Sequence, residues 1–142
     1  MMLRLSGAVV ALALAATPAL AQDAGADISF TFEVGQPSGQ VMLALFNSEA
    51  AYDGSGGPVR AQRAEVSGST VTVRFAGLPS GDYALKAFHD LDGDGEMDTN
   101  PFGMPTEPYA FSNNAVGNMG PASWERARFS AEGAVAQTIA LR

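Results

Sequence analysis

The sequence predicts an all-β protein that folds as a single antiparallel β-sandwich of about seven strands with one long ordered loop. The chain has 142 residues, enough for one domain and not comfortably for two. It contains 16 glycines and 8 prolines, a composition that favours many turns. Short segments alternate apolar and polar residues, and no long stretch has a helical period.

Three segments carry the clearest strand signals. Residues 28–34 and 71–75 alternate between apolar and polar side chains, as expected for strands with one buried face. Residues 41–46 (VMLALF) are apolar at every position, which is typical of a central strand covered on both sides. Weaker candidates cover residues 58–66, 83–88, 125–129 and 136–141. The inward positions predict a core of Phe30, Phe32, Leu43, Leu45, Val71, Val73, Phe75, Leu85 and Ile139.

Residues 1–21 have the pattern of a secretory signal peptide. Arg4 precedes an apolar run, and Ala19 and Ala21 form the small-residue cleavage pattern. The run is too short for a transmembrane helix, which needs about 20 apolar residues. Cleavage after Ala21 would leave a short flexible N-terminus, residues 22–26, and a β-sandwich domain, residues 27–142. We therefore expect a periplasmic or secreted protein without a transmembrane segment.

Charge and cysteine content exclude several classes of function. The formal net charge is −7, so the chain lacks the clustered cations that nucleic-acid binding requires. It has no cysteine, which excludes disulfides, thiolate zinc sites and thiol catalysis.

The long loop predicted over residues 89–120 begins with an acidic run. Five carboxylates alternate with other residues, at Asp90, Asp92, Asp94, Glu96 and Asp98. This spacing, with a glycine at position 95, matches the first half of a calcium-binding loop, in which oxygens at the first, third and fifth places converge on the ion. The backbone carbonyl of Glu96 would follow as a ligand, and Asp98 would take the ninth place.

The calcium pattern is incomplete at its end. Pro101 occupies the twelfth place, where a bidentate glutamate normally binds the ion. Asn100 or Glu107 offers a replacement oxygen, and spacing does not choose between them. The alternative is a solvated acidic turn that uses Asp and Gly for their turn chemistry. Magnesium is less expected than calcium because it keeps more of its water.

His89 is the only histidine and directly precedes the acidic run. It is an additional candidate metal ligand or acid–base group. The alternative is a strand-end imidazole that bonds to loop backbone. The Ser112–Asn113–Asn114 side chains similarly either satisfy backbone groups or bind a ligand such as a sugar.

Residues 78–90 (LPSGDYALKAFHD) resemble the strand-and-turn signature of transthyretin-like and carboxypeptidase-regulatory-like sandwiches. Further matching groups are His89-Asp90, Asp98-Thr99-Asn100, Phe102-Gly103-Met104-Pro105, Glu107, Tyr109, Phe111-Ser112-Asn113-Asn114 and Ala127-Arg128-Phe129. Together they resemble the bacterial family of domain of unknown function 2141 (DUF2141), over residues 28–141. That family often has Asn where this chain has Asp92 or Asp94. The resemblance implies an exported small β domain and no particular activity.

Two functions remain open from the sequence. The first is a non-catalytic exported module whose acidic loop, stabilised by calcium, forms a structural cap or an interaction surface for an envelope protein or a small ligand. The second is a metal-assisted hydrolase that uses His89 with neighbouring carboxylates. An open pocket holding the imidazole and two carboxylates would favour the enzyme, whereas a ring buried against backbone would favour the module.

Overall fold

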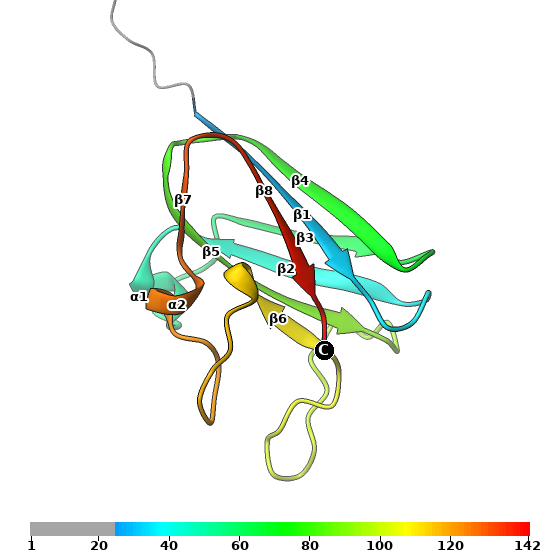
Figure 1. Cartoon of the computed structure of the whole chain (residues 1–142). Helices are drawn as coiled ribbons and strands as arrows, with labels where there is room; N and C mark the ends of the chain where they lie inside the picture. Colours follow the sequence, from blue (N-terminus) through cyan, green and yellow to red (C-terminus); the bar gives the residue numbers. More distant parts are fainter. Residues whose placement is uncertain (1–24) are drawn as a thin grey trace, which may run out of the picture.

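The computed structural model describes residues 25–142, so the predicted signal peptide and residues 22–24 lie outside the described part. Two β-sheets pack face to face (Figure 1). The strands are β1 (Ala26–Glu33), β2 (Gln40–Phe46), β3 (Arg60–Glu65), β4 (Thr70–Leu78), β5 (Gly81–Asp90), β6 (Tyr109–Phe111), β7 (Phe129–Ala131) and β8 (Gly133–Ala140). Three single turns of helix join them: α1 (Glu49–Tyr52), η1 (Ser112–Asn114) and α2 (Trp124–Ala127). Within residues 25–142, no helix is both long and apolar enough to cross a membrane.

The strand order confirms the all-β sandwich. One sheet has three strands in the order β4-β1-β8. The other has five, in the order β3-β2-β5-β6, with β7 pairing with the beginning of β5. All pairs in the five-stranded sheet are antiparallel, as is β1 with β4.

The pairing of β1 with β8 is parallel and differs from the antiparallel arrangement expected for every pair. The chain reaches β8 from β7, which belongs to the other sheet, and it crosses between the sheets at Gly133. Gly133 has a φ of +64°, a conformation that favours glycine, and its N–H donates to the carbonyl of Gly25 just before β1. Because β8 starts beside the start of β1, the two strands run in the same direction.

The core between the sheets is the one that the alternation predicts. Eight of the nine predicted residues are buried, and Val71 is partly buried against them. Phe30 lies at the centre, with its ring centroid 6.4 Å from that of Phe75 and 5.9 Å from that of Phe129, both edge to face. Such contacts add to the free energy of burying the rings.

A second apolar cluster covers one end of the outer face of the five-stranded sheet. It consists of Phe46, Tyr52, Ala84, Phe111, Ala122 and Ala127, with Trp124 packed against it. The side chains come from strands β2, β5 and β6, from the helical turns α1 and α2, and from the segment before α2. The Tyr52 hydroxyl donates to the carbonyl of Ala122 at 2.7 Å and so ties α1 to the segment before α2.

Two local predictions are wrong. Residues 125–129 are not a strand, because Trp124–Ala127 form a helical turn and β7 starts only at Phe129. The region predicted as a loop over residues 89–120 contains the end of β5 and the three-residue strand β6. Strand β6 is too short to show an alternation of apolar and polar residues in the sequence. It forms because the backbone of β5 at residues 86–88 is available to pair with it.

Replacement of Phe30 by alanine tests the core. Loss of a fully buried phenylalanine removes transfer free energy and leaves a cavity, so the free energy of unfolding should fall by about 3–5 kcal/mol. Urea denaturation of the mature chain measures it. Replacement of the exposed Val116 by alanine is the control and should change it by less than about 0.5 kcal/mol. A similar small loss for both variants would contradict this core.

Candidate metal site in the loop between β5 and β6

The acidic residues lie at the end of β5 and in the loop of residues 91–108, which leads to β6. This loop projects from one end of the sandwich (Figure 1, yellow-green). Its two arms run side by side, since Thr106 N–H donates to the Asp98 carbonyl and Asn100 N–H donates to the Met104 carbonyl, both at 2.8 Å. The loop is therefore an irregular hairpin.

The Asp90 carboxylate is fully buried at the base of the loop, and it accepts three hydrogen bonds. Gly93 N–H donates to Oδ1 at 2.9 Å, and Gly95 N–H donates to Oδ2 at 2.9 Å. The Gln40 side-chain amide donates to Oδ2 at 2.7 Å from the neighbouring strand β2. Asp90 thus fixes the first turn of the loop to the sheet.

Glu107 holds the returning arm in the same way. Its buried carboxylate accepts the N–H of Leu91 at 2.8 Å and the N–H of Asp98 at 3.1 Å, one on each oxygen. Leu91 follows Asp90 directly, and Asp98 lies further along the loop. One side chain therefore connects the beginning, the middle and the end of the acidic segment.

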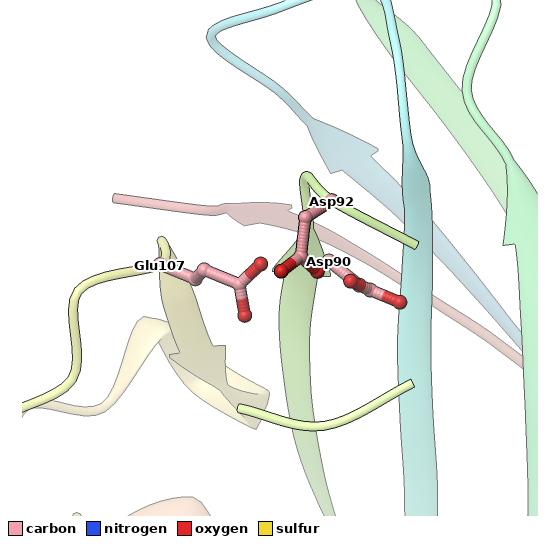
Figure 2. A group of neighbouring side chains, drawn as sticks. All are labelled: Asp90, Asp92 and Glu107. Carbon is pink, nitrogen blue, oxygen red and sulfur yellow. The ribbon is translucent and has the colours of Figure 1, made fainter. Parts of the chain in front are cut away.

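The carboxylates form two groups that share Asp92. Figure 2 shows the Asp92 carboxylate between those of Glu107 and Asp90, and one oxygen of each lies within 4.8 Å of the others. Oxygens of Asp92, Asp94 and Asp98 meet the same limit in a more exposed group. None of these residues forms an ion pair with a lysine, arginine or histidine of residues 25–142.

Hydrogen bonds and neighbouring charges move two of the pKa values in opposite directions. The hydrogen bond from Gln40 and those from the loop hold the pKa of Asp90 below its usual value despite burial. The Asp94 N–H lowers the pKa of Asp92, but desolvation and the neighbouring carboxylates outweigh it and raise that pKa to about 6. Asp90 therefore stabilises the fold at neutral pH and loses this effect as the pH falls through its lowered pKa. The raised pKa of Asp92 acts in the opposite direction: it disfavours folding increasingly as the pH rises from the usual value of 3.8 to about 6.

His89 is fully buried and faces away from the acidic groups. Its Nε2 lies 2.6 Å from the carbonyl oxygen of Ser38, in the turn between β1 and β2, and its Nδ1 has no hydrogen-bond partner among the described residues. The adjacent Gly39 has a φ of +78°, and a Cβ there would lie 2.4 Å from the Asp90 carbonyl oxygen. The end of β5 is thus packed tightly against this turn, which leaves the imidazole in neither carboxylate group.

The remaining sequence candidates have separate positions. The Asn100 side-chain oxygen accepts the N–H groups of Phe102 and Met104 within its own turn. The Glu96 side chain is exposed and joins neither group. Of the two candidates for the missing ligand, Glu107 is the one that the fold brings to the cluster. Gln40 is not among the residues expected from the sequence, because no local pattern connects it with a residue 50 positions away.

The Ser112–Asn113–Asn114 side chains satisfy backbone groups. The buried Ser112 hydroxyl accepts the Leu85 N–H at 2.9 Å and donates to the Ala127 carbonyl at 2.5 Å. The Asn113 amide donates to the carbonyls of α2, and Asn114 bonds to the backbone of β8. This group holds η1 against α2 and β8.

Fold and site together define a small β-sandwich protein with an acidic loop anchored by two buried carboxylates. The family described as "uncharacterized protein conserved in bacteria (DUF2141)" matches residues 33–139, which are most of the chain. The chain belongs to this family, as its motifs indicate. No curated protein and no solved structure matches it significantly, so the transthyretin-like detail stays a prediction.

The substitutions Asp90→Asn and Glu107→Gln test whether these two carboxylates anchor the loop. Both oxygens of each carboxylate accept N–H groups, so an amide nitrogen in place of one oxygen would set an N–H against an N–H and lose a charge-assisted bond. Asp90→Asn and Glu107→Gln should each lower the free energy of unfolding by about 1–3 kcal/mol in chelator-containing buffer. Asp94→Asn, at an exposed residue, is the matched control and should change it little. Equal effects at positions 90 and 94 would show that burial of Asp90 does not matter.

Proposed function

We propose that this protein is an exported, non-catalytic β-sandwich module whose acidic loop binds calcium. The bound ion would stabilise the loop as a structural cap and as an interaction surface. Asp90, Asp92, Asp94, Asp98 and Glu107 would supply the ligands, with the carbonyl of Glu96 as a further oxygen.

The observation that carries this proposal is the uncompensated negative charge at the base of the loop. Asp90 and Glu107 are buried, Asp92 lies beside them, and no cationic side chain of the described residues pairs with them. Buried charges in proteins are usually paired or bound to a metal. Desolvation and the neighbouring carboxylates raise the pKa of Asp92, and a cation would relieve the repulsion among these carboxylates.

The ligand chemistry supports calcium over other ions. Calcium takes six to eight oxygen ligands in flexible geometry, and the two groups that share Asp92 offer five carboxylates. The hydrogen bonds to Asp90 and Glu107 leave lone pairs on their oxygens, because an ionised carboxylate accepts at about four sites. Cysteine is absent and His89 is bonded elsewhere, which disfavours the softer metals.

The surroundings of His89 support a non-catalytic role. A metal-assisted hydrolase would need the imidazole to reach both a substrate and the metal. The ring is instead fully buried, with Nε2 against the Ser38 carbonyl. This is the arrangement that favours the module over the enzyme.

Export is the part of the proposal that the N-terminal sequence supports. If residues 1–21 are a signal peptide, the protein recovered from the periplasm or the medium should begin at Gln22. Intact-mass measurement of that protein gives the cleavage site directly. A mass that includes residues 1–21 would overturn this part.

Calcium should raise the melting temperature of the mature chain. Calcium sites of extracellular modules have dissociation constants of about 10⁻⁴–10⁻³ M, and the incomplete loop suggests the same range here. At a free concentration about ten times the dissociation constant, binding adds about 1.4 kcal/mol to the free energy of unfolding. This should raise the melting temperature by roughly 3–7 °C, as measured by differential scanning fluorimetry.

Controls separate binding from charge screening. Magnesium at equal concentration should give a clearly smaller shift in melting temperature, because it keeps more of its water. Charge screening alone would give the same shift with both ions. Asp92→Asn with Asp94→Asn should abolish most of the calcium effect and leave the metal-free fold intact. The matched control is Glu65→Gln with Glu132→Gln, which removes two exposed charges elsewhere and should keep the calcium effect. Equal shifts with both ions, or an unchanged response of the loop variant, would show that the loop is a solvated turn.

A further inference from the structure

The outer face of the five-stranded sheet carries a groove of about 1200 Å³. Its floor follows from the strand register: Met42 of β2 pairs with Arg63 of β3 on one side and with Phe88 of β5 on the other. In the next row, Ala44 lies beside Lys86. The apolar cluster around Tyr52 covers the adjoining end of this face, and the groove occupies the part that it leaves open.

Two loops form the walls of the groove. Met97, Phe102 and Met104 come from the acidic loop, and Met119 comes from the segment between η1 and α2. Figure 1 shows both loops projecting from the same side of the sandwich. All four methionines of residues 25–142 line the groove, and Phe102 is 90 % exposed. Flexible methionines and exposed aromatic rings around a hollow are typical of surfaces that bind apolar groups.

Strand β2 has an apolar outer face that the other described elements cover only in part. Its sequence is apolar on both faces, a pattern that predicts cover on both sides. Val41, Leu43 and Leu45 are buried in the core, whereas Met42 and Ala44 on the outer face are only partly buried. Apolar residues on a sheet face that no other element covers indicate a binding surface.

The charge of the groove is opposite to that of the protein. Arg63 and Lys86 are its charged lining residues, and no carboxylate of the described chain lines it, although the chain carries −7 overall. Lys86 donates to the Tyr52 carbonyl and lies 4.2 Å from the centroid of the Tyr52 ring, but it pairs with no carboxylate among residues 25–142. Burial lowers the pKa of Lys86, partly offset by Asp53. The Arg63 guanidinium forms no ion pair or hydrogen bond with residues 25–142.

We propose that this groove binds a small amphipathic anion, with its apolar tail along Met42 and Phe88 and its charged head at Lys86 and Arg63. Ligand sites of about 300–1,000 Å³ are typical for small molecules, and an open groove of this volume is large enough for a long tail. The charge complementarity selects an anionic head over a neutral or cationic one.

The proposal does not require the calcium site, and its test is done without calcium. The mature chain is titrated with dodecanoate and dodecyltrimethylammonium below their micellar concentrations and with dodecanol below its solubility limit. Chelator-containing buffer prevents the formation of calcium soaps. Isothermal titration calorimetry gives the affinities. Because the tails are identical, dodecanoate should bind about tenfold or more tightly than dodecanol, and the cation should bind most weakly.

Variants of the lining residues test where the head and the tail of the ligand bind. Lys86→Met and Arg63→Met should weaken dodecanoate binding toward the affinity of dodecanol and leave dodecanol unchanged. Arg60→Met is the matched control on the same strand, since Arg60 does not line the groove, and it should bind like the wild type. Phe102→Glu should weaken binding further, and this exposed residue can change without loss of the fold. Val116→Glu, at an exposed apolar residue outside the lining, should have no effect.

Three results would overturn the proposal: no binding of dodecanoate, equal affinity for the three amphiphiles, or variants at positions 63, 86 and 102 that bind like the wild type. Light scattering provides a further check. A dimer that Phe102→Glu dissociates would assign the groove to a second copy of the chain and would also overturn the proposal.

Discussion

The hydrogen bonds accepted by the buried carboxylates of Asp90 and Glu107 determine the path of the acidic loop. Asp90 binds the first turn of the loop to β2 through Gln40, and Glu107 binds both arms through the N–H groups of Leu91 and Asp98. N–H groups stabilise ionised carboxylates, but they do not cancel the net charge. The loop is therefore well anchored and strongly negative at the same place, and this combination underlies the proposed calcium site.

Turn formation and cation binding are compatible in this loop. Asp92 and Asp94 each accept a backbone N–H two residues further on, which is ordinary turn chemistry for aspartate. Each such bond occupies one acceptor position of a carboxylate that has several. The repeated Asp-x-Asp spacing thus shapes the loop and leaves oxygens free for an ion.

The acidic loop connects the two proposed sites. Its carboxylates gather at the base beside β5, while its apolar residues Met97, Phe102 and Met104 form a wall of the groove. The two sites differ in sign, since the base of the loop is acidic and the charged groups of the groove are Lys86 and Arg63. A cation and an amphipathic anion would accordingly bind to separate parts of the same structural unit.

The sequence by itself determined the features that depend on neighbouring residues. Alternation in β1 and β4 identified the core, and the acidic spacing identified the loop, because both patterns lie within a few residues. Only the tertiary structure could decide which distant groups meet. Gln40 bonds to Asp90, which is 50 positions away in the sequence. Glu107, and not Asn100, lies beside the other carboxylates. The His89 ring contacts the Ser38 carbonyl. The tertiary structure also made β1 and β8 parallel and left the outer face of β2 open, because these outcomes depend on how the sheets assemble and on which elements cover them.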